Sequence, residues 1–257
     1  MRAARGKPLM HALVEVDVTI ARQLLREHRE RTGEKLSFTA YIISCIARAV
    51  EEHPLAQARR LGRRRLVLFD DVDVCVQIEH RTGQGKQASP YVIYAANHKP
   101  FRTIHQEIRD VQAADVGGAW EMRGRRLYPY LPRPLRALLW RAFERSPRVR
   151  KRIAGTVMVT AVGMYAKGAG WGMSPTSGYT LELVLGGIAD RPFVVDGRLT
   201  NRQYLCMTTS VDHDVMDGAP FARFVQRLNE LIESGYGLEA AGIAQAGSTE
   251  AEPVAAR

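Results

Sequence analysis

The spacing of apolar residues divides the chain into helix-like and strand-like segments. Apolar side chains that return every three to four positions indicate amphipathic helices, whereas alternation with polar residues indicates half-buried strands. The helical spacing predicts helices over residues 19–33, 37–54, 101–112, about 134–145 and 218–235. The second of these is apolar nearly all round, so we expect it to be buried.

Most of the strand-like segments follow the first two helices. Two short strands are expected to meet near Asp70-Asp71, and a hairpin is expected to turn tightly at Asp196-Gly197. Further strands are expected within residues 91–98, 155–164, 179–189 and 203–213. Helices come first and strands follow, so the order fits an α/β two-layer sandwich with a mixed β-sheet better than a doubly wound fold.

Capping residues and prolines mark where several elements begin and end. Thr19 and Ser37 are the expected N-caps of the first two helices, and Gly33 ends the first. Prolines divide the later segment 123–152 into a loop, one helix and a second loop. The Ala-rich, polar end of the chain, residues 237–257, is expected to be a disordered tail.

Length and composition restrict the class of protein. The 257 residues suit one large domain or two small ones. The chain has no run of about 18 apolar residues, and its basic N-terminus lacks the apolar core of a signal peptide, so a cytoplasmic protein is expected. Cys45, Cys75 and Cys206 lie far apart in apolar runs, which favours buried free thiols over a disulfide framework or a metal site.

The net charge of +10 is unevenly distributed along the chain. Residues 123–152 hold eleven Arg and Lys side chains against one acid, Glu144, and the rest of the chain is close to neutral. Such a segment can meet nucleic acid, anionic lipid or a phosphorylated ligand, or it can be a solvated face. Arg148, Arg150 and Arg152 are the side chains that we expect to make such a contact.

A histidine at the end of an expected strand is the main candidate for chemistry. His213 lies between two aspartates in VDHDVMDGA, just before the last helix. One interpretation is a core histidine that makes a single structural hydrogen bond. The other is a general base, because Asp217 lies four residues on, Gly218 allows a tight turn, and a carboxylate can orient an imidazole.

The stretch DHDVMDGA, with His213, Asp217 and Gly218, resembles the His-x-x-x-Asp-Gly signature of chloramphenicol acetyltransferase and of the 2-oxoacid dehydrogenase acyltransferase (dihydrolipoamide acyltransferase) catalytic domain. The resemblance to the second group runs from about residue 10 to 234. Its segments, in the family's order, are LVEVDVT, KLSFTAYIISCIARAVEEHPLAQA, FDDVDVCVQIE, HKPFRTIHQEIRD and GTVMVTAVGM. Together they are more specific than the histidine motif alone.

The resemblance implies a fold, an assembly and a mechanism. The implied fold is chloramphenicol acetyltransferase-like, formed by residues 1–236 with a basic insertion at about 121–153, and it assembles as a homotrimer. Coenzyme A, as acyl-CoA, would enter a channel between subunits as a substrate, and no metal is implied. By the same resemblance His213 is the general base, Asp217 braces its loop, and Thr160 of a neighbouring subunit replaces the serine that donates to the oxyanion.

The chain departs from the family pattern near these residues. Asp214 replaces the usual arginine after the histidine, and Ala161 replaces the usual asparagine after the oxyanion residue. An ordinary β-strand threonine is the alternative interpretation of Thr160. The glycine-rich stretch YAKGAGWGMSP, residues 165–175, lacks the spacing of a phosphate loop and is interpreted as channel wall.

The start of the chain also departs from the family pattern. No lipoyl domain, subunit-binding domain or flexible linker precedes residue 10, so we expect a stand-alone acyltransferase without covalently bound lipoate. Its acceptor would be a thiol, an alcohol or an amine, and a lipoyl domain or a carrier protein would be supplied in trans. A non-catalytic trimeric scaffold with the same fold is the alternative function.

The basic segment leaves three interpretations of its own. Residues 133–152 combine leucines, Trp140 and Phe143 with many arginines, which fits a basic amphipathic helix at a membrane surface and a membrane-peripheral protein. Nucleic-acid binding is the weaker alternative, because the arginines and aromatic residues come without a recognised motif. The third is a helix docked on the trimer, with a basic rim near the phosphates of CoA.

Overall fold

The computed structural model describes residues 8–62, 64–82, 85–113, 130–163, 168–174, 178–195 and 197–243 of the chain. Its main sheet has the strand order β1-β8-β7-β6-β4-β5. These strands are β1 (Leu9–Asp17), β4 (Val74–Thr82), β5 (Gly85–Ile93), β6 (Val157–Ala161), β7 (Leu181–Val195) and β8 (Arg198–Asp212). Two short strands, β2 (Arg59–Leu61) and β3 (Arg65–Val67), form a separate antiparallel pair.

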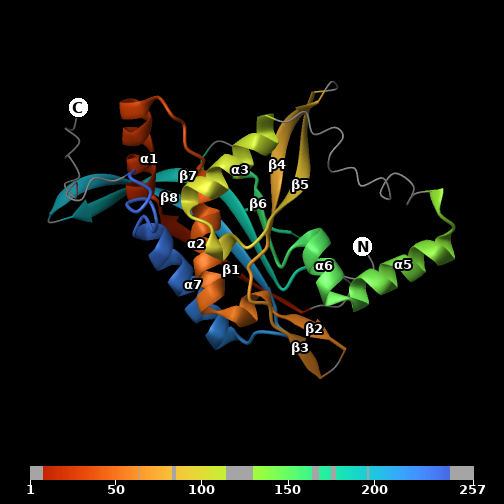
Figure 1. The fold of residues 1–257 in the computed structure, drawn as a ribbon. Helices are drawn as coiled ribbons and strands as arrows, with labels where there is room; N and C mark the ends of the chain where they lie inside the picture. Colours follow the sequence, from red (N-terminus) through yellow and green to blue (C-terminus); the bar gives the residue numbers. More distant parts are fainter. Residues whose placement is uncertain are drawn as a thin grey trace.

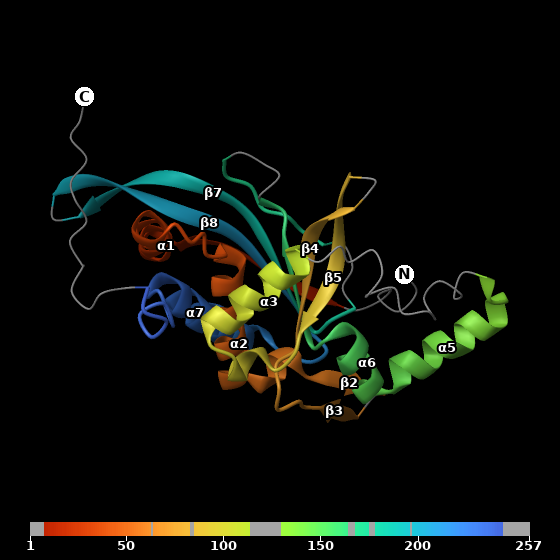
Figure 2. The same ribbon diagram turned by 45° about the horizontal axis from the view of Figure 1, so that its top comes forward.

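A layer of helices covers one face of the main sheet (Figures 1 and 2). It consists of α1 (Thr19–Thr32), α2 (Phe38–Glu52), α3 (Phe101–Ala113) and α7 (Gly218–Glu233). Two further helices, α5 (Arg133–Arg145) and α6 (Pro147–Ala154), lie to one side, and the short 3-10 helices are Pro54–Gln57 and Ala96–His98. In the main sheet β6 pairs in parallel with β4 and β7, and the other pairs are antiparallel, so the predicted α/β sandwich with a mixed sheet is confirmed.

The core lies between the sheet and this helix layer. Side chains of a strand alternate between its two faces, and the burial along β6 shows which face is which. Val157 and Val159 are fully buried in the core, whereas Met158 and Thr160 point to the opposite face and are only partly buried. We call that opposite face of the main sheet the open face.

The helix α2 is the centre of the helix layer, as its apolar sequence predicts. The Ser37 hydroxyl caps it by accepting a hydrogen bond from the Ala40 backbone N–H at 3.2 Å. Tyr41 is fully buried, and its hydroxyl donates to the backbone oxygen of Ile232 at 2.6 Å, which ties α2 to the end of α7. Because burial removes water from this hydroxyl, the bond to the backbone is the partner that the group requires.

The start of α1 differs from the expectation. Val18 is the N-cap residue, and Thr19 is already inside the helix. The reason is Asp17, whose Oδ1 accepts hydrogen bonds from the backbone N–H of Thr19 at 2.9 Å and from its hydroxyl at 2.5 Å. The end of the helix is as expected, because Gly33 adopts a left-handed φ of 75°.

The expected hairpin forms between β7 and β8. Their antiparallel pairing reaches Val195 and Arg198, so the turn falls at the two residues between them. Gly197 adopts a φ of 76° there, and Asp196 lies outside the described residues. A positive φ in a two-residue turn is what the Asp-Gly signal predicts.

A glycine-rich loop crosses the open face of the sheet. Residues 168–174 run over β7, where the Gly187 backbone N–H donates to the oxygen of Gly170 at 2.9 Å. A Cβ on Gly187 would stand 1.9 Å from the Gly168 oxygen, so only glycine lets the two backbones approach this closely. The stretch that was interpreted as channel wall therefore lies against the face that carries Thr160.

The basic segment forms two helices where one helix and a loop were expected. Pro147 begins α6, because the first turn of a helix leaves its backbone N–H groups without partners and so tolerates proline. The Ser146 hydroxyl caps α6 by accepting from the Val149 backbone N–H at 3.4 Å. The helix expected at 134–145 is present as α5, and the loop expected before it lies mostly outside the described residues.

The end of the folded chain also lies beyond the expected position. Leu238 is fully buried and Ile243 is 3% exposed, and both belong to the core next to α7. Residues 237–243 are therefore packed, although the sequence placed them in a disordered tail, because two apolar side chains spaced along a polar stretch were not recognised as anchors. Residues 244–257 lie outside the described residues.

Two expectations from composition can be compared with the structure. Cys45, Cys75 and Cys206 are buried and free, as predicted. Burial raises the pKa of Cys45 to about 12 and also raises the pKa of Cys75, so neither thiol is a nucleophile at neutral pH. Among the described residues, no helix is both long enough and apolar enough to span a bilayer.

Candidate active site

His213 lies on a short loop between the end of β8 and the start of α7. Its side chain is 48% exposed, and its backbone N–H donates to the oxygen of Pro8, just before β1, at 2.8 Å. The imidazole therefore lies at the surface of the subunit, while the backbone beneath it is held in place. This arrangement leaves a polar ring accessible to solvent on a loop whose backbone is anchored.

Asp212, which the sequence analysis did not single out, fixes the shape of this loop. Its side chain is almost fully buried, and its Oδ1 accepts a hydrogen bond from the Asp214 backbone N–H at 3.1 Å. Its backbone oxygen accepts from Val215 and Met216 at 3.0 and 3.1 Å. The sequence does carry a signal for this role, because Asp212 is an acid at the end of an apolar strand. A carboxylate buried there requires hydrogen-bond partners, and the backbone of the following loop supplies one.

The other two acids near His213 face different partners. Asp217 is the N-cap residue of α7, and its side chain is 82% exposed. The distance from its Oδ1 to His213 Nδ1 is 3.7 Å, which exceeds hydrogen-bond length. The Asp214 carboxylate forms an ion pair with Arg60 of β2, so a cation far away in the sequence compensates the acid that replaces the family's arginine.

Thr160 lies on the open face, in a row of residues that crosses four strands. The row runs from Thr160 of β6 through Val184 of β7 and Thr208 of β8 to Leu13 of β1. Leu13 is 49% exposed, whereas Thr208 is fully buried and its hydroxyl has no hydrogen-bond partner among the described residues. The half-buried Thr160 is thus part of a face that mixes polar and apolar side chains.

Within one subunit His213 and Thr160 do not meet. The sheet register aligns Thr160 with Thr208, two strands away, and His213 lies five residues beyond Thr208. With about 4.8 Å between strands and about 3.3 Å per residue, the Cα atoms of His213 and Thr160 are about 19 Å apart. A general base and an oxyanion donor both act within about 3 Å of the reacting atoms. One subunit alone therefore cannot place both on the same carbonyl group.

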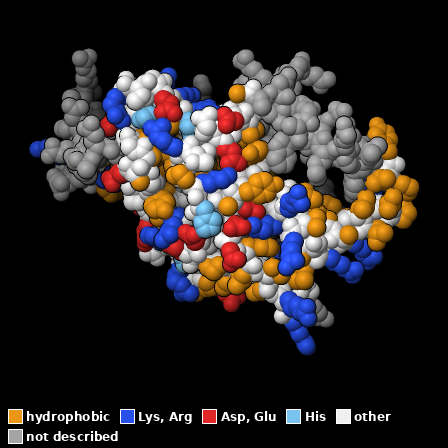
Figure 3. Space-filling view, in the orientation of Figure 1, with side chains coloured by type: hydrophobic (Ala, Val, Ile, Leu, Met, Phe, Trp, Pro, Cys, Tyr) orange, Lys and Arg blue, Asp and Glu red, His pale blue; other side chains and the backbone are white. Residues whose placement is uncertain are grey.

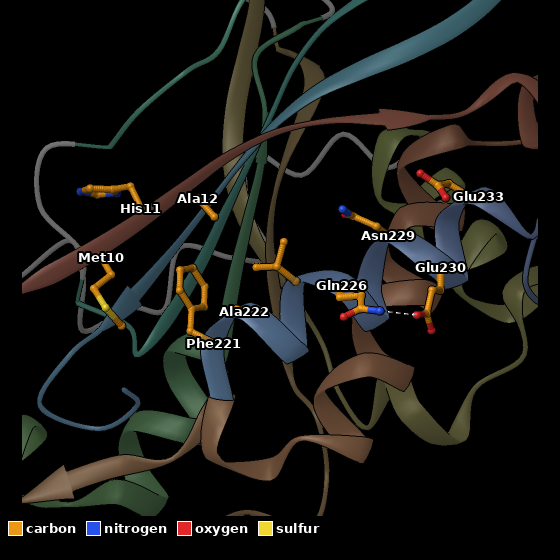
Figure 4. Close-up of a pocket in the computed structure, with 10 residues that line it drawn as sticks. Met10, His11, Ala12, Phe221, Ala222, Gln226, Asn229, Glu230 and Glu233 are labelled. Atoms are coloured by element: carbon orange, nitrogen blue, oxygen red, sulfur yellow. Dashed lines mark hydrogen bonds between the residues drawn. The ribbon is translucent and has the colours of Figure 1, made fainter. Parts of the chain in front are cut away.

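A groove of about 860 Å³ lies between the edge strand β1 and α7 (Figure 4). His11 lines it from β1, with its Nδ1 2.8 Å from the Ser210 hydroxyl, while Phe221 and Asn229 line it from α7. None of the three predicted site residues lines this groove. The groove is thus separate from the loop of His213, although its β1 wall begins close to the residue that holds that loop.

Comparison with known proteins agrees with the sequence motifs. The model of the family described as 2-oxoacid dehydrogenases acyltransferase (catalytic domain) matches residues 1–121 and 149–238. The search of curated proteins gives no match. Because the match covers most of the chain, the acyltransferase class expected from the sequence is confirmed.

Three solved structures illustrate the similarity of fold. Azotobacter vinelandii dihydrolipoamide acetyltransferase, studied for the roles of a serine, a histidine and an asparagine in its catalytic mechanism, shares 18% identity over 94% of this chain and 86% of that chain, with a TM-score of 0.64. The cubic core of a pyruvate dehydrogenase multienzyme complex shares 17% identity over 94% and 86%, with a TM-score of 0.64. A chloramphenicol acetyltransferase shares 17% identity over 88% and 89%, with a TM-score of 0.52.

These likenesses show the fold, which is the chloramphenicol acetyltransferase-like sandwich expected from the sequence. The family match shows more, because it follows the order of motifs along the chain and includes both β6 and the loop of His213. The chain therefore belongs to the 2-oxoacid dehydrogenase acyltransferase family and carries the catalytic domain of that family.

Proposed function

We propose that the chain is a CoA-dependent acyltransferase that exchanges an acyl group between a CoA thioester and a thiol acceptor. His213 is the general base, and Thr160 of a neighbouring copy is the oxyanion donor. The observation that carries this proposal is the exposed imidazole of His213 on a loop that Asp212 holds in shape. An alcohol or an amine acceptor would use the same two groups.

The proposed reaction begins with the acceptor thiol. His213 Nδ1 is the ring nitrogen nearer to Asp217, which leaves Nε2 to take the proton from sulfur. The sulfur then attacks the carbonyl carbon of the acyl-CoA, and the carbonyl oxygen becomes an oxyanion. When the intermediate collapses, the bond to the CoA sulfur breaks and the protonated His213 returns the proton to CoA. The products are the acylated acceptor and free CoA.

Thr160 is proposed to donate its hydroxyl hydrogen to that oxyanion. One such donor contributes about 100- to 1,000-fold in rate in other enzymes. A threonine hydroxyl can do what a serine does, although its methyl group restricts the side-chain rotamer. The position of Thr160 on the open face supports this role, because a second copy of the chain that covers this face would bring its own substrate to the hydroxyl.

A homotrimer is the assembly proposed for this site. The separation of about 19 Å between His213 and Thr160 requires a second copy to complete the site. A cubic core, such as that of the similar pyruvate dehydrogenase structure, contains threefold axes, and around a threefold axis each copy can offer His213 to one neighbour and Thr160 to the other. A separate observation supports the roles of His213 and Asp217. The histidine and the asparagine named for the catalytic mechanism of the Azotobacter enzyme are four positions apart, and His213 and Asp217 have the same spacing.

The partners proposed for the reaction are acyl-CoA and a thiol carrier. A lipoyl domain or a carrier protein supplied in trans would deliver the thiol, since this role belongs to the family rather than to a feature of the described residues.

A non-catalytic trimeric scaffold remains the second candidate function, and Ala161 and Asp214 are the residues that favour it. The pairing of Asp214 with Arg60 weakens that argument, because the added acid is compensated.

Turnover by the purified full chain tests the proposal. A panel of acyl-CoAs is incubated with a dithiol, an alcohol and an amine, and acylated products are measured by mass spectrometry. With the best pair, His213→Ala should lower kcat by about 100- to 10,000-fold. His98→Ala is a matched control, because His98 is 59% exposed and lies 3.6 Å from a carboxylate, yet belongs to another part of the surface. Equal loss in both variants, or none in His213→Ala, would contradict His213 as the base, and no turnover by the unaltered chain with any pair would favour the scaffold.

A further inference from the structure

The helix α5 is set apart from the rest of the molecule. The family model leaves residues 122–148 unmatched, and α5 lies entirely within that gap. None of its residues is buried, and the ribbon shows it projecting away from the sandwich (Figures 1 and 2). Neither the catalytic domain of the family nor the core of this chain accounts for the helix.

The exposed surface of α5 has an apolar side bordered by arginines. At about 100° per residue, the apolar side chains cover an arc of about 200° around the helix. Arg133 and Arg145 lie at its two borders, whereas Arg136 lies within it and Arg141 on the opposite side. The apolar side chains are Leu135, Leu138, Leu139 and Trp140, with exposures of 40%, 63%, 45% and 40%. The arginines are Arg133, Arg136, Arg141 and Arg145. Figure 3 shows the hydrophobic side chains gathered over α5, with Lys and Arg side chains beside them.

The single acid of α5 is already paired with arginines. Glu144 Oε2 accepts from Arg59 at 2.6 Å, and its Oε1 accepts from Arg150 at 2.8 Å. Both carboxylate oxygens thus face the body of the protein. The exposed side of the helix therefore presents only apolar groups and positive charge.

The base of α5 is fixed firmly to the body. Arg150 of α6 is 7% exposed, and its guanidinium donates to the Gly178 oxygen as well as to Glu144. Lys151 makes ion pairs with Asp71 and Asp73 at 3.0 and 3.1 Å. Arg150 is therefore a structural residue, which corrects the expectation that it is available to a ligand. Together these contacts attach α6 and the last turn of α5 to the body.

We propose that α5 binds the surface of an anionic lipid bilayer. The helix lies in the plane of the interface, its leucines and Trp140 enter the boundary between headgroups and acyl chains, and its arginines pair with lipid phosphates. The charge and the apolar arc of one exposed helix are complementary to this partner and to no part of the described chain. The inference does not rest on acyl transfer, because α5 contains none of the proposed site residues.

Other partners fit the exposed side of α5 less well. A second copy that met α5 with its own α5 would bring two arginine-rich, acid-free helix surfaces together, and any other surface of that copy belongs to a chain of net charge +10. Nucleic acid would use the arginines but would leave Leu138 and Trp140 in water. An acidic protein would have to enclose the helix in a groove, and the last turn of α5 is held against the body by Glu144. A flat surface reaches the exposed side without this obstacle.

Vesicle binding by the full chain tests the proposal. The probes are phosphatidylcholine vesicles with and without about a third of phosphatidylglycerol, and bound protein is measured by sedimentation. We expect binding to the anionic vesicles only, weakening as salt rises from 0.05 to 0.5 M because salt screens exposed charges. Arg133→Gln/Arg145→Gln should weaken binding by about tenfold or more, since each cation near such a surface matters by about one kcal/mol. Leu138→Ser/Leu139→Ser should weaken it similarly without any change of charge.

A charge-matched control separates α5 from net charge. Arg29→Gln/Arg198→Gln removes two exposed arginines from α1 and from the β7–β8 hairpin, and it should bind vesicles like the unaltered chain. Circular dichroism confirms that each variant is folded. The proposal is overturned if the unaltered chain ignores anionic vesicles, or if the control loses as much binding as the α5 variants. It is also overturned if the leucine variant binds vesicles normally. The same holds if the α5 variants keep their affinity for vesicles and lose affinity for a DNA duplex or an acidic protein instead.

Discussion

Replacing Gly187 by alanine tests the packing of the glycine-rich loop on the open face. A Cβ at Gly187 would stand 1.9 Å from the Gly168 oxygen, whereas an ordinary contact begins at 3.4 Å. The two backbone segments must therefore separate by about 1.5 Å, and the hydrogen bond from Gly187 to Gly170 is strained or lost. Overpacking costs about 1–3 kcal/mol, and a lost hydrogen bond adds about 1 kcal/mol.

This loss of stability should be visible in the melting temperature. For a domain of this size each kcal/mol lowers Tm by about 2–4 °C, so Gly187→Ala should melt about 4–16 °C below the unaltered chain. Gly170→Ala is the matched control, because no atom lies within 4 Å of its added Cβ. Protein concentration is kept equal, since assembly would shift Tm by itself. Equal Tm values for the two variants would refute the backbone contact described here.

Three further predictions follow from single side chains. Asp212→Ala removes the acceptor of the Asp214 backbone N–H, so it should lower stability by about 0.5–1.5 kcal/mol in denaturant titrations and reduce turnover; full activity would contradict its role in the loop. Arg150→Gln should lower Tm by at least about 5 °C in calorimetry, because it removes the buried cation that joins Glu144 to the Gly178 oxygen, and an unchanged Tm would contradict that role. The Arg227 side chain holds the pKa of Glu52 below its usual 4.5, so this pair stabilises the fold above about pH 4.5 and the benefit is lost as pH falls further. The Tm difference between the unaltered chain and Glu52→Gln should accordingly shrink between pH 6 and pH 3, and a constant difference would count against the pair.

Local sequence signals were sufficient for most elements of the fold. The apolar periods located α1, α2, α3, α5 and α7, and the cap at Ser37 and the turn before Arg198 occur where the sequence indicated. These features depend on residues within a few positions of one another. The errors at Thr19 and Pro147 were also local, because a neighbouring acid took over the cap and a proline was interpreted only as a helix breaker.

The features that the sequence could not indicate depend on contacts between distant residues. The pairing of Asp214 with Arg60, and of Glu144 with Arg59, joins segments that no periodicity relates. The burial of Arg150 likewise depends on Gly178, whose backbone oxygen offers no signal in the sequence. Net charge indicated a basic surface but not which arginines are structural.

For the candidate site, the sequence identified residue types but not distances. His213 was correctly placed at the end of a strand, and Thr160 on a strand next to the centre of the sheet. Asp212 was missed because a buried acid and an exposed acid look alike in VDHDVMDG. The separation of His213 and Thr160 within one subunit follows only from the strand order, which places β7 between β6 and β8.

Mixing two inactive variants tests most directly whether the active site forms between copies. His213→Ala and Thr160→Ala chains, carrying different affinity tags, are co-expressed in equal amounts, and mixed assemblies are isolated through both tags. In a trimer that carries both tags, one of the three sites combines an intact His213 with an intact Thr160 from its neighbour, so activity should return to about a third of the unaltered value. Each variant alone should remain at least about 100-fold slower. Mixed assemblies as inactive as the separate variants, or a chain that is monomeric yet active, would contradict the account.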